Sequence, residues 1–90
     1  MKQVQIIVSG NVQGVGYRYF SQMKAIQHDI RGWAKNLPDG KVEISALGLE
    51  EGLNKFINEI RHGNPFSNVE NVEVNEIERS ENYSSFTIKY

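Results

Sequence analysis

The sequence predicts an α+β fold of the ferredoxin-like type, a βαββαβ sandwich in which two helices cover one face of an antiparallel sheet and a short extra strand ends the chain. Two observations predict this fold. The spacing of apolar residues alternates between the period of two typical of strands and the three-and-four spacing typical of helices, in that order. The chain has 90 residues, enough for one hydrophobic core, so we expect one domain over residues 1–90.

The first strand and the first helix are separated by a glycine-rich stretch. Apolar and polar residues alternate from Val4 to Val8, and the strand ends at Gly10. The apolar residues then recur three and four positions apart, which predicts a helix from about Arg18 to about His28. The residues expected on the buried face of this helix are Tyr19, Phe20, Met23, Ile26 and Ile30.

The second helix has the most regular apolar stripe in the chain. Its spacing is that of one helical face, and Gly63-Asn64-Pro65 provides the stop signal. The residues of this stripe are Leu49, Leu53, Phe56, Ile57 and Ile60.

The remaining strands are shorter. Residues 30–36 and 42–46 are expected to form a hairpin around the turn Leu37-Pro38-Asp39-Gly40. Residues 72–77 predict a fourth strand, with a bulge where the alternation slips toward Ile77, and residues 86–90 predict a fifth.

Composition excludes several classes of function. Without cysteine, the chain can form no disulfide, no thiolate nucleophile and no Cys-based zinc site. Ten Lys and Arg against eleven Asp and Glu give a formal charge of -1, so nucleic acid and anionic membranes are not expected partners. The N-terminal residues lack the apolar run of a signal peptide or a membrane span, and we expect a cytoplasmic protein.

The stretch from Gly10 to Arg18, which we call the glycine loop, has the features of an anion site. It joins a strand to a helix N-terminus, where free backbone N–H groups and the helix dipole favour an anion. Gly14 and Gly16 allow successive N–H groups to turn toward one point, and the planar guanidinium of Arg18 can pair with phosphate oxygens. The glycine spacing matches neither the nucleotide-binding P-loop nor the dinucleotide fingerprint. Taken alone, the loop is also compatible with a tight connection and a solvated arginine.

The predicted topology brings a second segment to this loop. In a βαββαβ sheet the first two strands run parallel with another strand between them, so both end at the same edge. We therefore expect Asn36, at the end of the second strand, to lie roughly 10 Å from the loop, two strand spacings away. An amide side chain there can both donate to and accept from a water molecule.

These segments resemble the two signature motifs of the acylphosphatase family. The first motif is matched by Gly10, Val12-Gln13-Gly14-Val15, Tyr17 and Arg18, and the second by Gly32-Trp33-Ala34-Lys35-Asn36, Asp39-Gly40, Val42 and Gly48. The resemblance covers essentially the whole chain, and Phe86-Thr87-Ile88-Lys89-Tyr90 is similar to the closing strand of the family. The chain departs from the pattern at Asn64-Pro65-Phe66-Ser67, a difference that concerns a connecting loop and not the glycine loop.

The resemblance implies a hydrolase that cleaves acyl phosphates to a carboxylate and inorganic phosphate, with phosphate as a competitive inhibitor. It implies that Asn36 positions the attacking water and that Arg18 binds the phosphoryl group. The loop amides expected to help are those of Gln13, Gly14, Val15, Gly16, Tyr17 and Arg18. We expect no cofactor and no metal ion, because neither motif contains a carboxylate cluster, and we expect a monomer.

Two further side chains have simpler interpretations than a role in the site. Trp33 could stack on an acyl group, but a tryptophan on a strand that faces helices is more often part of the core. Ser21 lies near the glycine loop in the sequence, yet the simpler expectation is that its hydroxyl caps a local backbone group or faces solvent.

The histidines and carboxylates also favour structural interpretations. His28 and His62 have no partner at metal-ligand spacing. The carboxylates of the second helix are expected to be solvated, with Glu51 and Lys55 paired across one helical turn; the three considered are Glu50, Glu51 and Glu59.

Two other classes of function fit the sequence less well. An acylphosphatase-like segment also stands at the front of hydrogenase-maturation carbamoyltransferases, but from the length of 90 residues we expect no further domain after Tyr90. Ferredoxin-like sheets also bind RNA, but the glycine and aromatic signature of that class is absent and the net charge is not basic.

Overall fold

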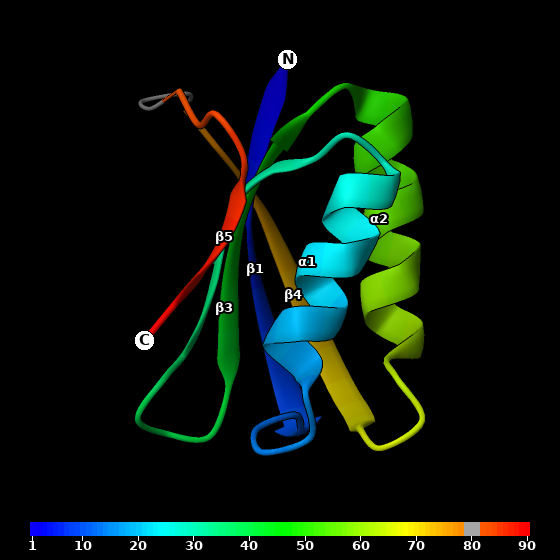
Figure 1. The fold of residues 1–90 in the computed structure, drawn as a ribbon, viewed down its shortest axis with the longest axis vertical. Coiled ribbons are helices and arrows are strands. Elements are labelled where there is room, and N and C mark those ends of the chain that lie inside the picture. Colours follow the sequence, from blue (N-terminus) through cyan, green and yellow to red (C-terminus); the bar gives the residue numbers. More distant parts are fainter. Residues whose placement is uncertain (79–81) are drawn as a thin grey trace.

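The computed structural model describes residues 1–78 and 82–90 and has the predicted element order (Figure 1). The elements are β1 (Lys2–Asn11), α1 (Tyr17–Gln27), β2 (Arg31–Asn36), β3 (Val42–Gly48), α2 (Glu50–His62), β4 (Asn68–Ile77) and β5 (Phe86–Lys89). The strands form one sheet in the order β4-β1-β3-β2-β5. Both helices lie on the same face of this sheet, which confirms the predicted sandwich.

The C-terminal strand makes the sheet mixed. β1 pairs antiparallel with β3 and β4, and β2 pairs antiparallel with β3. β5 runs parallel to β2, with Lys35 opposite Lys89. β5 therefore ends at the same edge of the sheet as β2, and the last residues of the chain lie near Asn36.

The predicted meeting of β1 and β2 at one edge is confirmed by the strand register. Val8 near the end of β1 and Asn36 at the end of β2 both lie opposite Val42 of β3. Figure 1 shows the loop after β1, the β2–β3 hairpin and the α2–β4 connection at the same end of the molecule. Three segments far apart in the sequence are thus available to build one site.

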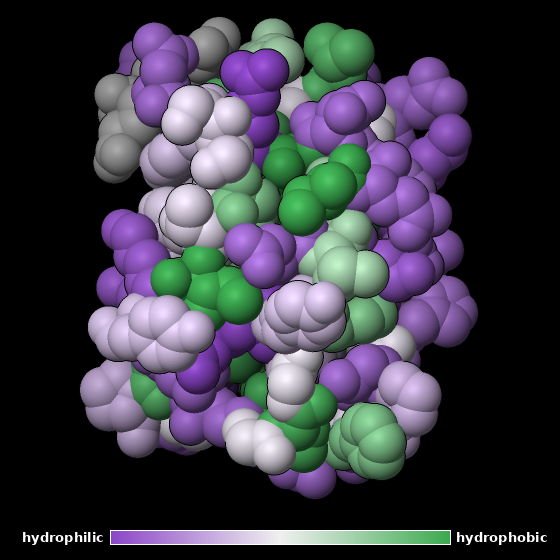
Figure 2. Space-filling view, in the orientation of Figure 1, coloured by the Kyte–Doolittle hydropathy of each residue, from purple (hydrophilic) through white to green (hydrophobic). Residues whose placement is uncertain are grey.

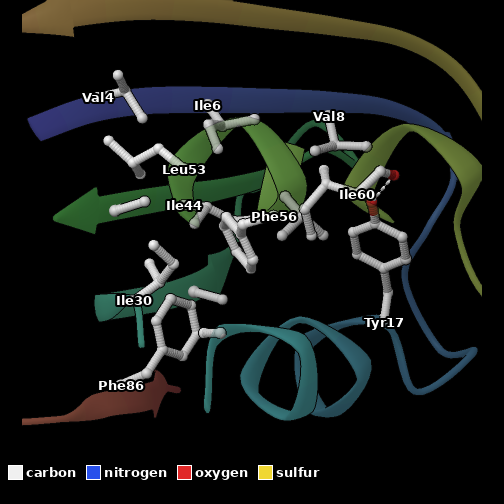
Figure 3. Packing of buried hydrophobic residues seen from close by; sticks show 14 of the residues in the cluster. Val4, Ile6, Val8, Tyr17, Ile30, Ile44, Leu53, Phe56, Ile60 and Phe86 are labelled. Carbon is white, nitrogen blue, oxygen red and sulfur yellow. Dashed lines mark hydrogen bonds between the residues drawn. The ribbon is translucent and has the colours of Figure 1, made fainter. Parts of the chain in front are cut away.

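The core lies between the sheet and the helices (Figure 3). The apolar residues expected from the alternation of β1, Val4, Ile6 and Val8, are buried, and Gln3 is buried as well. On α2, Leu53, Phe56 and Ile60 are buried, Ile57 is half-buried, and Leu49 at the helix start is exposed. Burying each large aliphatic or aromatic side chain stabilises the fold by about 1.5–3 kcal/mol.

The predicted face of α1 is wrong for its helical residues, although Ile30, which lies beyond the end of the helix, is buried as predicted. The buried residues of α1 are Tyr17, Ser21 and Ala25, whereas Tyr19, Met23 and Ile26 are each more than half exposed and Phe20 is only partly buried. The small side chains of Ser21 and Ala25 let the helix backbone lie close to the sheet. The Ser21 hydroxyl satisfies its hydrogen bonding locally by donating to the Tyr17 carbonyl at 2.8 Å, so this serine is not part of an anion site.

The prediction that Trp33 belongs to the core is also wrong. Gly32 and Ala34 are its buried neighbours and Ala34 joins the core, so Trp33 points to the opposite, open face of the sheet. It is half-buried there, and the ammonium groups of Lys35 and Lys89 lie 5.3 and 4.5 Å from its ring centroid. Cation–π contacts replace the expected packing against the helices.

The bulge lies at the start of β4 and not near Ile77. Ser9 is opposite Asn71 while Gly10 is opposite Val69, so one extra residue is inserted in β4. Gly10 has φ +124°, and a Cβ there would overlap the carbonyl oxygen of Asn68. Only glycine fits at this point, where β1 leads into the glycine loop.

The exposed surface combines polar residues with separate apolar patches. In the face seen in Figure 2, hydrophobic residues form patches that are interrupted by hydrophilic ones. Among residues 1–78 and 82–90, no helix has the length and apolar character needed to cross a membrane.

Candidate active site

The glycine loop, the start of α1 and the end of β2 enclose a hollow of about 160 Å³. The predicted residues Gly14, Gly16, Tyr17, Arg18 and Asn36 all line it. The other residues that line the hollow are Val12, Tyr19, Ile88 and Tyr90. The juxtaposition expected from topology is therefore present, and Ile88 of β5 and the following Tyr90 add to it.

Several backbone N–H groups of the glycine loop and the first turn of α1 have no acceptor among residues 1–78 and 82–90. Gly14 and Gly16 have φ of +74° and +73°, and Gly16 caps α1 without any side-chain hydrogen bond. The first helical bond runs from the Phe20 N–H to the Gly16 carbonyl at 3.0 Å, so the N–H groups of residues 17–19 have no acceptor within the helix. The first turn carries no acidic residue. The partial positive charge at this helix end is thus available to an anion.

Arg18 is oriented by the C-terminal strand. Its Nη1 donates a hydrogen bond to the Lys89 carbonyl at 2.9 Å, and its guanidinium lies 4.8 Å from the ring centroid of Tyr90. A guanidinium has five N–H donors, so most remain for a ligand. Among the ion pairs of the described residues, none involves Arg18, and its charge is not neutralised by a carboxylate there.

Gln13 connects the loop to the hairpin through its side chain. Its Nε2 donates to the carbonyl oxygens of Leu37 and Lys41, both at 2.8 Å. The side chain is therefore occupied, and only the backbone N–H of Gln13 remains for a ligand. The two bonds also fix the loop relative to the hairpin that carries Asn36.

The Tyr17 hydroxyl and the Val15 carbonyl both form hydrogen bonds with groups outside the hollow. The Tyr17 hydroxyl donates to the Ile60 carbonyl at 2.6 Å, and burial raises the pKa of this hydroxyl well above its ordinary value. The Val15 carbonyl accepts a hydrogen bond from Nδ2 of Asn64 at 2.8 Å. The segment that departs from the family pattern thus does contact the glycine loop, contrary to expectation, because the α2–β4 connection passes beside it.

The Asn36 side chain is exposed and makes no hydrogen bond within the described part of the chain. The adjacent turn is held by other groups: the Leu37 N–H donates to the Lys41 carbonyl at 2.8 Å, and the Lys41 N–H donates to Asp39 at 3.2 Å. Asn36 is therefore free to hold a water molecule at the hollow.

The histidines lie outside the site. Nε2 of His28 lies 3.0 Å from Oε2 of Glu59, and Lys24 lies 3.5 Å from the same oxygen. The His28 hydrogen bond lowers the pKa of the Glu59 carboxyl, and Glu59 joins the two helices instead of being a solvated charge. Nδ1 of His62 lies 2.9 Å from the Asn58 carbonyl within α2.

The other carboxylates of α2 are exposed at its surface. Glu51 pairs with Lys55 at 3.4 Å, as predicted. Within residues 1–78 and 82–90, no group of three or more His, Cys, Asp or Glu side chains is placed to hold a metal ion.

A larger hollow of about 540 Å³ lies at the opposite end of the molecule. It is lined by the C-terminal end of α1 and the N-terminal end of α2, including Ile26, Leu49 and Lys55. None of the residues predicted for the anion site lines it. Size alone therefore does not identify the candidate site, whereas the free amides at the N-terminus of α1 and the residues of the two motifs do.

Comparison with known proteins agrees with the motifs. The acylphosphatase family model matches residues 4–88. Acylphosphatases from Bacillus velezensis and Archaeoglobus fulgidus are 50% and 49% identical to this chain over 90 residues, with 100% of each chain covered. The crystal structure of acylphosphatase from Bacillus subtilis is similar over 100% of both chains, with 47% identity and a TM-score of 0.96. Full-length HypF in a phosphate- and nucleotide-bound form is similar over 99% of this chain and 12% of its own, with 31% identity and a TM-score of 0.84.

Proposed function

Because this chain belongs to the acylphosphatase family and is an enzyme that hydrolyses acyl phosphates, we propose that Arg18 and the loop amides hold the phosphoryl group while Asn36 positions the attacking water. The observation that carries this proposal is the hollow that unites Arg18, the two loop glycines and Asn36. Its charge comes from one guanidinium and one helix N-terminus, which suits a dianionic phosphoryl group.

The reaction needs little further machinery. Water attacks phosphorus, the P–O bond to the acyl group breaks, and a carboxylate leaves with inorganic phosphate as the other product. The leaving carboxylate has a conjugate acid of pKa about 4, so no general acid is required. Phosphoryl transfer has a loose transition state with charge on the equatorial oxygens, which Arg18 and the amides stabilise.

Direct attack by water is supported by the side chains around the hollow. The chain has no cysteine, and neither histidine lines the hollow. The Tyr17 hydroxyl is buried against Ile60, and Ser21 donates within α1. A substrate phosphate oxygen can accept the proton that the water loses. We therefore propose a mechanism without a phosphoenzyme, metal ion or cofactor.

The enzyme is proposed to act as a cytoplasmic monomer. The apolar stripe of α2 is buried against the protein's own sheet at Leu53, Phe56 and Ile60, and the absence of cysteine fits a reducing compartment. Light scattering of the purified protein tests the monomer directly, and a stable dimer would contradict it.

A phosphate-release assay tests the function. The wild-type protein should hydrolyse acetyl phosphate and leave a phosphate monoester almost untouched, because the monoester's alkoxide leaves poorly without a general acid. Inorganic phosphate should inhibit competitively. The Arg18→Ala variant is the control for contaminating phosphatases and should lose both activity and phosphate inhibition. Rapid hydrolysis of the monoester, or no hydrolysis of acetyl phosphate, would contradict the proposal.

A further inference from the structure

Asn64 contacts the glycine loop from outside both signature motifs. Its Nδ2 donates to the Val15 carbonyl at 2.8 Å, and Nδ2 lies 4.0 Å from the position that a Cβ on Gly16 would occupy. The Oδ1 atom is buried and makes no hydrogen bond with the described residues. The amide orientation is nevertheless required, because the reverse orientation would place two acceptor oxygens against each other.

The position of Asn64 is fixed by its own turn. Its N–H donates to the Ser67 hydroxyl at 3.0 Å, and its carbonyl accepts from that hydroxyl at 3.0 Å and from the Ser67 N–H at 3.2 Å. Pro65 follows and restricts the backbone of Asn64 to extended conformations. Gly63 precedes it with φ +72°, where it ends α2. The side chain is thus presented from a constrained loop.

The contact determines how one amide of the anion site is directed. The Val15 carbonyl and the Gly16 N–H belong to the same planar, trans peptide group, so they point in opposite directions. Holding the carbonyl toward Asn64 therefore holds the Gly16 N–H on the other side of the loop. Gly16 lines the hollow that also contains Arg18 and Asn36.

We propose that Asn64 is a positioning residue that keeps the Gly16 N–H directed at the bound phosphoryl group. Glycine allows a wide range of backbone torsions at positions 14 and 16, so without this contact the peptide between residues 15 and 16 can turn and direct its N–H away from the ligand. The inference deepens the proposed function and rests on it for the identity of the substrate. Phosphate binding tests it without any substrate.

The test compares two variants of Asn64 with a neighbouring asparagine. Asn64→Ala removes the contact, and Asn64→Asp keeps the shape but cannot donate when ionised. Asn68→Ala is the matched control, since Asn68 is exposed at the start of β4 and its side chain makes no hydrogen bond among the described residues. Calorimetry gives the dissociation constant of inorganic phosphate, and the Gly16 amide resonance reports the phosphate contact.

Loss of one directed donor should weaken phosphate binding by about 3- to 10-fold in Asn64→Ala and by at least as much in Asn64→Asp. The phosphate-induced shift of the Gly16 amide should shrink in both, and kcat/KM for acetyl phosphate should fall at least as far as binding. The Asn68→Ala variant should match the wild type. Asn64→Asp covers the case in which the alanine variant fails to fold.

A merely structural role gives a different result. Folded Asn64 variants would then melt at a lower temperature but bind phosphate within about twofold of the wild type, which would overturn the inference. If the wild-type protein binds phosphate but hydrolyses no acyl phosphate, the proposed function fails while the Asn64 comparison still stands. A wild-type protein that binds no phosphate overturns both.

Discussion

The Tyr17→Phe substitution tests how the start of α1 is anchored. The Tyr17 hydroxyl is buried and donates to the Ile60 carbonyl at 2.6 Å (Figure 3). Ile60 lies in the last turn of α2, where the carbonyl oxygens receive no hydrogen bond from an N–H group of the helix. Removing the hydroxyl therefore leaves a buried carbonyl without this donor, at the point where the two helices meet behind the glycine loop.

The expected loss of stability follows from this geometry. A buried polar group left without its partner costs about 1–3 kcal/mol. For a domain of this size, each kcal/mol lowers the melting temperature by about 4–8 °C. Tyr19→Phe is the matched control, because Tyr19 is 61% exposed and makes no hydrogen bond with the described residues. It should change stability by less than about 0.5 kcal/mol.

Urea unfolding measures both variants, and its pH dependence adds a second check. Burial raises the pKa of Tyr17 above its ordinary value of 10.0, so the folded protein holds this proton more tightly than the unfolded chain. The resulting stability is present below about pH 10 and is lost as the pH rises further. The wild type should therefore lose more stability than Tyr17→Phe at alkaline pH. Equal stability of Tyr17→Phe and Tyr19→Phe, with parallel pH curves, would refute the reasoning.

Three further predictions concern the site itself. Arg18→Lys keeps the charge but loses the planar fork, and steady-state kinetics should show kcat reduced by about 10²- to 10³-fold; unchanged turnover would exclude bidentate binding. Gln13→Ala removes two hydrogen bonds between the glycine loop and the hairpin, so urea unfolding should show a loss of about 1–2 kcal/mol in the free energy of unfolding, and kcat/KM should fall. Normal kinetics would show that catalysis does not depend on this connection. Excess chelator should leave acetyl phosphate hydrolysis intact, because Arg18 and amides supply the positive charge; activity restored only by a divalent ion would contradict the mechanism.

The fold could be predicted from the sequence because its signals are local. Strand alternation, the stripe on α2 and the turn at Pro38 and Gly40 each follow from neighbouring residues, and together they imply the shared edge of β1 and β2. The face of α1 could not be found in this way. Apolar size favoured Met23 and Ile26, but the close approach of the helix to the sheet selects small side chains at Ser21 and Ala25.

The core of the site was predictable and its supports were not. Arg18 and Asn36 belong to motifs, and the topology alone brings them together. The orientation of Arg18 by Lys89 and Tyr90 depends on the parallel pairing of β5, for which the sequence carries no local signal. Asn64 had a signal, its departure from the family pattern, but only the path of the α2–β4 connection shows that it reaches Val15.

The Asn36→Ala variant tests the central claim, that the groups binding phosphate are separate from the group placing the water. A ligand that binds only the folded state stabilises it by about 2.7 kcal/mol at 100 times its dissociation constant, so thermal melts with and without phosphate report binding. We predict that Asn36→Ala keeps the wild-type phosphate-induced shift while kcat for acetyl phosphate falls by about 10²-fold or more, and that Arg18→Ala loses the shift. Near-normal turnover of Asn36→Ala, or a loss of activity in proportion to weaker phosphate binding, would contradict the account.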